Sequence, residues 1–270
     1  MTISKVVQQS LFSLSCLLFT FSMASAQENS PQQITMCTEH WPPFVIVEEG
    51  KSITQGSWIV LLNEIFNDLP GYSLKIKSVP WKRCLLLIEA GKIDGTFSLF
   101  MKPERLAYMN FTMPVVLDRS MIWYSSINFT TPLSWSRFQD LAQYKIGVIR
   151  GENFNKEIDQ LISSQQIKAF HVTNDVQNFK KLALGRIDII VKNERVGWAL
   201  VNELQLNQSV KSAFKPAYLK KRYLSFTKHK DYHQLIDMIN IKVKKMQAKG
   251  DIRKILGYKP IKKESEAQDI

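Results

Sequence analysis

Cysteine, glycine and proline are all scarce in this chain of 270 residues. Three cysteines are too few for a fold built on disulfides. Glycine (11) and proline (10) are also too few for a collagen-like or other low-complexity architecture. The remaining composition, 45% hydrophobic and 22% charged, is that of an ordinary soluble globular protein.

Several motifs of common enzymes are absent. The chain has no Gly-x-Ser-x-Gly elbow, no phosphate-binding loop and no dinucleotide fingerprint. His229 and His233 have a spacing that suits metal binding on a helix, but only Asp231 lies near them. We therefore predict no cofactor and no metal. Lysine and arginine are dispersed along the chain, which argues against nucleic-acid binding.

Long hydrophobic runs are lacking except near the N-terminus. There, Lys5 precedes an apolar run over residues 11–21, and Ala24-Ser25-Ala26 supplies the small residues at which signal peptidase cleaves. The run is too short to span a bilayer comfortably. We predict that residues 1–26 are a signal peptide cleaved after Ala26 and that the protein is exported to the periplasm. The alternative is an N-terminal membrane anchor.

Charge and the remaining cysteines leave two questions open. Lysine and arginine number 36 against 24 acidic residues, a formal net charge of +12 that favours anionic partners without identifying one. After cleavage, Cys37 and Cys84 remain. An oxidising compartment permits a disulfide between them, but two buried thiols are an equal alternative.

Strand and helix patterns alternate along the chain, which predicts an α/β fold with a mostly parallel sheet. The first series has expected strands at 34–37, 72–79 and 93–100, separated by expected helices at 58–69 and 81–90. A second series repeats this order with strands at 144–149, 167–172 and 187–191 and helices at 155–164 and 174–184. Residues 231–250 read as one more amphipathic helix and 252–257 as a helical turn.

The two series also share a local sequence. Leu87 to Asp94 (LIEAGKID) matches Lys181 to Asp188 (KLALGRID), with a glycine that can end a helix before each strand. A duplicated block predicts two similar lobes.

Four stretches in order resemble one protein family, the bacterial extracytoplasmic solute-binding proteins of family 3, which serve polar amino-acid ABC importers. The resemblance spans about residues 34–257. It is carried by His40-Trp41-Pro42-Pro43-Phe44, by Val79 to Arg83 with 91–95, by Lys102 to Arg105 with 111–114, and by 145–151.

The resemblance implies a two-lobed, type II periplasmic-binding-protein clamshell (a Venus flytrap) with two hinge crossovers. Residues 27–125 and 219–261 would form the first lobe and 126–218 the second, with 262–270 as a frayed tail. The ligand would lie between the lobes, where open α/β sheets bind ligands at the carboxyl ends of their strands.

Residues of the first lobe give the main ligand contacts that the resemblance implies. Arg105 would clamp a ligand carboxylate, since a guanidinium can donate two parallel hydrogen bonds to one carboxylate. The alternative is a surface arginine paired with Glu104 or Asp118. Lys102 replaces the threonine of the family motif and adds a second cation.

Aromatic and hydroxyl groups complete this half of the expected site. Trp41, Trp81 and Phe44 would form its walls, the alternative for each being core packing. Aromatic walls also attract a cationic head through the ring face. Ser98 would offer its hydroxyl, although the chain from Asp94 to Arg105 is one residue shorter than in familiar members.

In the second lobe, the turn of Gly151, Glu152 and Asn153 would present N–H groups to an anion. Glu152 stands where the family has threonine or serine, and its carboxylate would repel an anion unless it points away. Asn193 stands where the family has an aspartate that binds the ligand's ammonium, and an amide brings no charge. A ligand with a carboxylate and no obligatory ammonium therefore becomes plausible.

These residues predict a monomeric, non-enzymatic binding protein for a small carboxylate-bearing solute, an amino acid or related organic acid, with an inner-membrane ABC permease or a sensor as partner. One alternative is a dehydratase-like enzyme on the same scaffold, with Glu152 or Glu194 as general acid. Another is a sensing module without a transport role.

Overall fold

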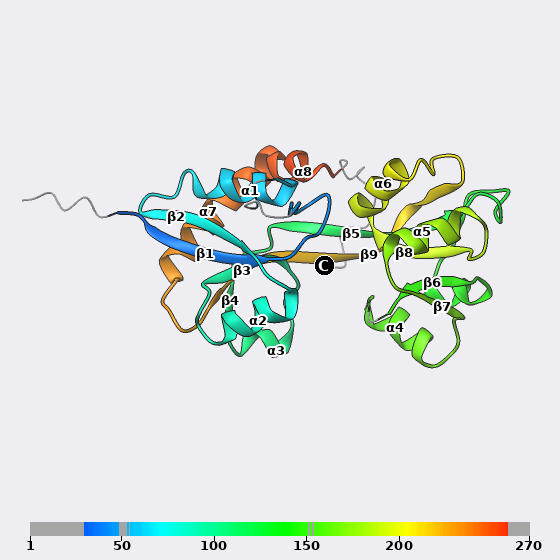
Figure 1. Cartoon of the computed structure of the whole chain (residues 1–270), viewed down its shortest axis with the longest axis horizontal. Helices are drawn as coiled ribbons and strands as arrows, with labels where there is room; N and C mark the ends of the chain where they lie inside the picture. The colour runs from blue at the N-terminus through cyan, green and yellow to red at the C-terminus, as the bar shows by residue number, and fades with distance from the viewer. Residues whose placement is uncertain (1–29, 49–52, 54, 151, 153, 259–270) are drawn as a thin grey trace, which may run out of the picture. The chain divides into compact units, whose positions relative to one another are not determined.

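The computed structural model describes residues 30–48, 53, 55–150, 152 and 154–258 (Figure 1). Its strands are β1 Gln32–Thr38, β2 Tyr72–Ser78, β3 Gly95–Leu99, β4 Met109–Phe111, β5 Val116–Ser125, β6 Ile146–Ile149, β7 Ala169–Val172, β8 Ile189–Asn193 and β9 Val210–Thr227. Its helices are α1 Ser57–Phe66, α2 Trp81–Glu89, α3 Pro103–Leu106, α4 Lys156–Ser163, α5 Asp175–Ala183, α6 Glu194–Glu203, α7 His233–Lys249, α8 Asp251–Leu256 and the 3₁₀ helix η1 Phe138–Gln143.

The first lobe is built on the parallel strands β2, β1 and β3, as the first series predicts. Apolar residues at helical spacing in α1 pack into the core, and α1, α7 and α8 contact one another. Figure 1 shows these three helices together on one side of the strands and α2 on the other. Helices on both faces are expected of a parallel sheet, whose strands must be buried on both sides.

The second lobe repeats the arrangement with parallel strands β7, β6 and β8. Asn155 begins α4 and Asn174 begins α5, and each side-chain oxygen accepts a hydrogen bond from the backbone three residues on. The predicted duplication is thus confirmed at the level of elements.

Two long strands, β5 and β9, join the parallel strands of one lobe to those of the other. The described strands form one sheet in the order β2-β1-β3-β9-β5-β8-β6-β7, and β4 also pairs β9. β9 runs antiparallel to β5 from Val210 to Arg222 and then pairs β3 from Tyr223 to Phe226. The sequence analysis did not predict β9. Its 18 residues include Pro216 and several lysines, so they lack the alternation that marks a strand.

Cys37 and Cys84 are joined by a disulfide, which settles the alternative left open by the sequence. Both residues are fully buried in a small core cluster with Ile88, Ile93 and Leu99. The bond ties the end of β1 to the first turn of α2.

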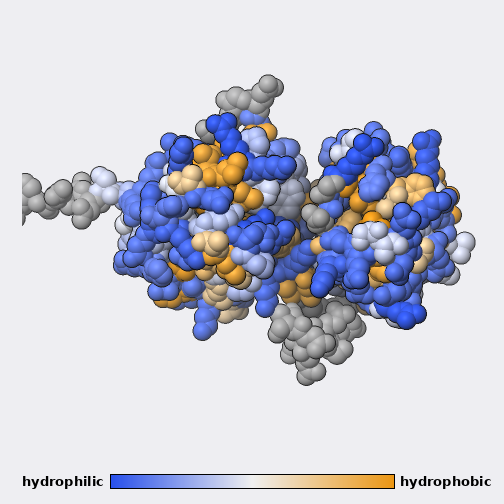
Figure 2. Space-filling view, turned by 90° about the horizontal axis from the view of Figure 1, so that it is seen from below, coloured by the Kyte–Doolittle hydropathy of each residue, from blue (hydrophilic) through white to orange (hydrophobic). Residues whose placement is uncertain are grey.

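The surface of the described residues has both hydrophilic and hydrophobic areas. The face in Figure 2 is mostly hydrophilic, with hydrophobic residues in several separate areas. None of the helices in the described ranges is long and apolar enough to cross a membrane. The predicted signal peptide lies outside the described residues.

Candidate functional site

A pocket of about 180 Å³ lies where strands of the first lobe end. β1 ends at Thr38, β3 ends at Leu99 and α2 begins at Trp81. The carboxyl ends of neighbouring parallel strands are where α/β proteins bind ligands. The pocket is lined by Thr38, Glu39, Trp41, Trp81, Phe97, Ser98 and Arg222. Three predicted site residues therefore meet here.

Trp41 forms one wall of this pocket. It lies in a tight turn after β1 that is closed by hydrogen bonds between Trp41 and Val45. Its ring packs on Phe44 with centroids 4.4 Å apart. Phe44 itself is fully buried in the main core cluster, so it supports Trp41 from behind. The structure places Phe44 in the core rather than in the pocket lining, which is the alternative left open for it.

Trp81 forms the facing wall, at the first residue of α2. Glu39 fixes this helix start, because its Oε2 accepts a hydrogen bond from the Trp81 N–H at 2.9 Å. The Cys37–Cys84 disulfide also holds α2 in place, at a residue one turn after Trp81. The two indoles are thus mounted on two segments that a covalent bond holds together.

Ser98 has an unusual backbone and an unsatisfied side chain. Its φ of 56° is in the left-handed region, and the register of β3 against β9 shifts at this residue. The residue is 7% exposed, and its Oγ has no hydrogen-bond partner in the described structure. Buried hydroxyl groups are almost always hydrogen-bonded, so this one points to an absent partner.

Arg222 also lines the pocket, and sequence reasoning did not nominate it. It lies on β9 where that strand changes partner from β5 to β3. Its Nε and Nη2 donate to Asp118 Oδ2 at 2.7 and 2.5 Å, and its Nη1 donates to the Ser98 carbonyl at 2.8 Å. In the sequence it stands in the run Lys220-Lys221-Arg222, which resembles a solvated basic stretch.

The Arg222 guanidinium lies close to two rings. Its Cζ is 4.7 Å from the centroid of Trp41 and 4.1 Å from that of Phe100. Both distances are within the range of cation–π interactions. The structure also shows that the Trp41 ring is already occupied by a cation of the protein itself.

Arg105 lies beside the pocket, next to Trp81. It is in α3, and its Nη1 donates to the Phe100 carbonyl at 2.6 Å. Its Cζ is 5.8 Å from the Trp81 centroid. The side chain is half-buried, and burial lowers the pKa of the guanidinium. Within the described residues it forms no ion pair, so the alternative pairing with Glu104 or Asp118 is not observed.

Lys102 and Lys220 add to the positive charge around Phe100. Lys102 is largely exposed, and its Nζ is 3.9 Å from Glu104. Lys220 Nζ is 4.8 Å from the Phe100 centroid and donates to the Phe154 carbonyl at 2.5 Å. Burial lowers the pKa of Lys220; the charge of Asp159 acts to raise it, and the charges of Arg222 and Lys102 act to lower it.

In the second lobe, Glu152 forms an ion pair with a lysine. Its Oε1 is 2.9 Å from Lys192 Nζ, which also lies 2.6 Å from Asp175. Burial acts to lower the pKa of Lys192, but the two carboxylates outweigh burial and raise it. The predicted repulsion by Glu152 is therefore reduced by its cation partner. Gly151 and Asn153 lie outside the described residues.

The side-chain amide of Asn193 forms hydrogen bonds within the protein. Its Oδ1 accepts hydrogen bonds from the backbone of Arg195 and Val196, which caps α6. Its Nδ2 donates to Asp118, which also accepts a hydrogen bond from the Tyr258 hydroxyl at 2.6 Å. Burial and this contact with Asp118 raise the pKa of Tyr258. With both ends of its amide used, Asn193 offers nothing to a ligand in this arrangement.

The family model for bacterial extracellular solute-binding proteins, family 3, matches residues 34–257. The chain belongs to this family. The match confirms the resemblance of the four sequence stretches and covers both lobes. None of the curated proteins matches the sequence.

Solved structures show the same fold as this family 3 protein. A probable amino-acid ABC transporter extracellular-binding protein from Bacillus subtilis is 16% identical, with a TM-score of 0.69 over 84% of this chain and 96% of that one. The L-cystine solute receptor of Neisseria gonorrhoeae, unliganded and open, is also 16% identical, with a TM-score of 0.63 over 84% and 92%. A histidine kinase sensor domain is 13% identical, with a TM-score of 0.63 over 87% and 100%. The predicted two-lobed type II fold is confirmed.

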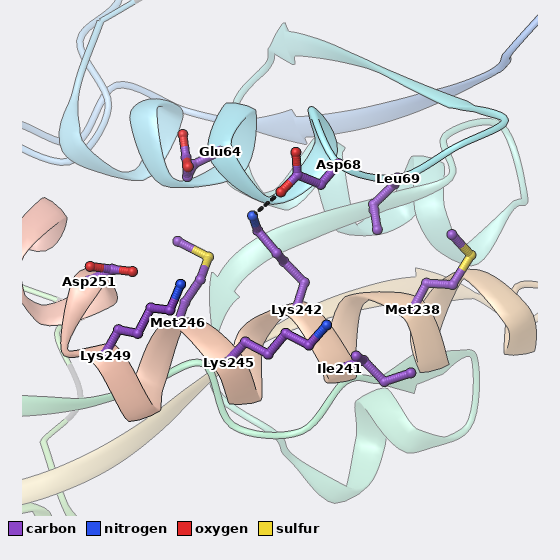
Figure 3. Close-up of a pocket in the computed structure, with 10 residues that line it drawn as sticks. All are labelled: Glu64, Asp68, Leu69, Met238, Ile241, Lys242, Lys245, Met246, Lys249 and Asp251. Atoms are coloured by element: carbon purple, nitrogen blue, oxygen red, sulfur yellow. Dashed lines mark hydrogen bonds and ion pairs between the residues drawn. The ribbon is translucent and has the colours of Figure 1, made fainter.

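This family 3 protein has a larger hollow elsewhere, a groove of about 520 Å³ between α1 and α7 (Figure 3). Lysines of α7 face carboxylates in or next to α1 and α8, and Lys242 bonds to Asp68. The groove is lined by Glu64, Asp68, Leu69, Met238, Ile241, Lys242, Lys245, Met246, Lys249 and Asp251. None of the predicted site residues lines it.

Proposed function

We propose that the protein is an exported binding protein that captures a small carboxylate-bearing solute, an amino acid or related organic acid, for an ABC-type importer. The observation that carries this proposal is Arg105, a half-buried guanidinium beside Trp81 without an ion-pair partner in the described structure. A partly desolvated cation without a counter-ion is costly, and a solute carboxylate would offset that cost.

In this proposal, two lobes close around the solute. We assign residues 27–125 and 219–261 to the first lobe and 126–218 to the second, with the solute enclosed as they close. Residues 1–26 act as the cleaved signal peptide in this proposal, which places the protein in the periplasm.

The enzyme alternative has little support from the two candidate acids. Glu152 pairs with Lys192, and Glu194 is 2.5 Å from Arg119. Both carboxylates are thus committed to cations, whereas a general acid must hold a proton for transfer.

The test is a thermal-shift screen of amino acids, keto acids and dicarboxylates, followed by calorimetry on each hit. A solute at 100 times its Kd stabilises the protein by about 2.7 kcal/mol. Arg105→Ala should abolish that shift, and Arg83→Ala on the exposed side of α2 is the matched control. An Arg105→Ala protein that binds like the wild type would refute the carboxylate clamp. Recovery of the solute unchanged after incubation separates binding from catalysis.

A further inference from the structure

The pocket between Trp41 and Trp81 contains hydrogen-bond donors that Arg105 does not supply. We infer that this pocket holds a second anionic group of the solute, bound by Ser98 Oγ and the free edge of Arg222, so that the solute class is a small dicarboxylate. The inference rests on the proposed function, in which Arg105 binds the first carboxylate.

Ser98 supplies the first donor. Its hydroxyl is buried and has no partner among the described residues, and the residue lines the pocket. The left-handed backbone at Ser98 is a conformation that non-glycine residues rarely adopt. Strained residues of this kind concentrate at binding sites, where the surrounding structure holds them in place.

Arg222 supplies the other donors. A guanidinium carries five N–H groups and is not deprotonated in proteins. Asp118 and the Ser98 carbonyl accept three of them. One N–H on each Nη remains, and Arg222 lines the pocket. The N–H groups of a guanidinium point outward in its plane, which is the geometry in which arginine binds a carboxylate.

The surrounding charge favours an anion. Lys102, Arg105, Lys220 and Arg222 gather around Phe100 and the indoles, and the carboxylates paired with them are Asp118 and Glu104. Glu39 also lines the pocket, but it is exposed and holds the start of α2. With Asp159, whose charge acts on Lys220, these cations and carboxylates are equal in number. An anion is favoured because Arg105 and Lys220 form no ion pair among the described residues.

The two guanidinium groups lie at different indoles, Arg105 at Trp81 and Arg222 at Trp41. Each is placed to meet a different end of a solute. The pocket volume of about 180 Å³ is below the usual range for a whole ligand site, so it suits one end group.

The experiment compares diacids with their monoamides by calorimetry on the mature protein. The pairs are succinate and succinamate, glutarate and glutaramate, aspartate and asparagine, and glutamate and glutamine. At least one diacid should bind about tenfold or more tightly than its monoamide, since only the diacid brings a second charge to Arg222. Equal affinities within every pair, or no binding of any diacid, would overturn the inference.

Two variants isolate the hydroxyl. Ser98→Ala and Ser98→Gly both remove Oγ, and glycine also relieves the left-handed backbone. Both should weaken binding of the diacid about tenfold and leave the monoamide unaffected. Gln165→Gly, at another left-handed residue remote from the pocket lining, is the control and should change neither. A Ser98→Gly protein with wild-type diacid affinity would overturn the inference.

The two proposals can fail separately. If monocarboxylates bind through Arg105 and a second acidic group adds nothing, the dicarboxylate inference fails and the carboxylate clamp stands. If Arg105→Ala binds diacids as the wild type does, the clamp itself fails.

Discussion

Two of the hollows in the described structure differ in size and in chemistry. The groove along α7 is about 520 Å³, and the pocket between the indoles is about 180 Å³. In the groove, lysines and carboxylates face one another close to solvent, as the bonded Lys242 and Asp68 do. In the pocket, the buried Ser98 hydroxyl lacks a partner, and the guanidinium of Arg222, whose side chain is 13% exposed, keeps unused donors.

The two hollows therefore differ in whether their polar groups already have partners. Exposed charges can exchange their partners for water at little cost, so the groove gains little from a ligand. Buried donors without a partner have lost their hydrogen bonds to water. A ligand that accepts hydrogen bonds from them therefore gains more binding free energy in the pocket. Variants that remove ionic or covalent bonds beside each hollow test this difference.

The largest effect is expected at Asp118, the buried counter-ion of Arg222. Asp118 is 3% exposed and holds Arg222, Asn193 and Tyr258 together. Asp118→Ala would leave a buried guanidinium without a partner, and we expect a loss of about 3–5 kcal/mol in the free energy of unfolding. Urea denaturation measures this loss.

A double variant serves as the control for Asp118. Asp118→Leu with Arg222→Leu removes both charges at once, and it should be less destabilised than Asp118→Ala, because no buried charge is left unpaired. If Asp118→Ala unfolds at the wild-type urea concentration, the pocket is held by other contacts and the contrast with the groove is lost.

The disulfide is expected to have a similar or slightly smaller effect. Cys37 and Cys84 are 47 residues apart, and closing a loop of that length stabilises a protein by about 4 kcal/mol in the chain-entropy model. The double variant Cys37→Ala/Cys84→Ala should lose about that much in urea denaturation. It should also bind the solute more weakly, since the bond ties the segments that carry Trp41 and Trp81. A variant that keeps full affinity would show that packing alone sets the distance between the indoles.

The sequence predicts most helices and the short parallel strands, because each has its own periodicity and end signals. The helix expected at 81–90, for example, is α2 at Trp81–Glu89. β9 was missed for a physical reason. Its regularity comes from pairing with β5 and β3, which are distant in the chain, and its own residues include lysines and Pro216.

The residues around the pocket were nominated in part, for similar reasons. Trp41, Trp81 and Ser98, which line the pocket, and Arg105 beside it all stand in local motifs. Arg222 was missed because its role depends on Asp118, which is 104 residues away. Asn193 and Phe44 were nominated by position, but the cap of α6 and the core of the first lobe use them instead.

A smaller effect is expected from Asp94, at the end of β3 opposite the pocket. Burial acts to raise its pKa, but hydrogen bonds from Lys230, Tyr232 and Thr35 outweigh burial and lower it. The folded state therefore releases this proton more readily than the unfolded state. The resulting stability is present above the ordinary aspartate pKa and is lost as pH falls through the lowered one.

Asp94→Asn tests this assignment. The variant should lose part of the acid dependence of its urea midpoint below pH 4, an effect on the order of 1 kcal/mol. The wild type and the variant are compared in steps between pH 7 and pH 2.5. If the urea midpoints of the wild type and of the variant fall in parallel as pH is lowered, other carboxylates cause the acid sensitivity.

The smallest effect is expected in the groove, at Asp68. The Lys242 partner lowers the pKa of Asp68, but the Asp68 side chain is 67% exposed. Water solvates both ions as soon as the pair is broken, so Asp68→Asn should leave the urea midpoint and the affinity for any carboxylate solute unchanged. Both are measured beside Asp118→Ala under the same conditions. A loss of solute affinity in Asp68→Asn would couple the groove to the pocket and reverse the conclusion that the larger hollow is not the binding site.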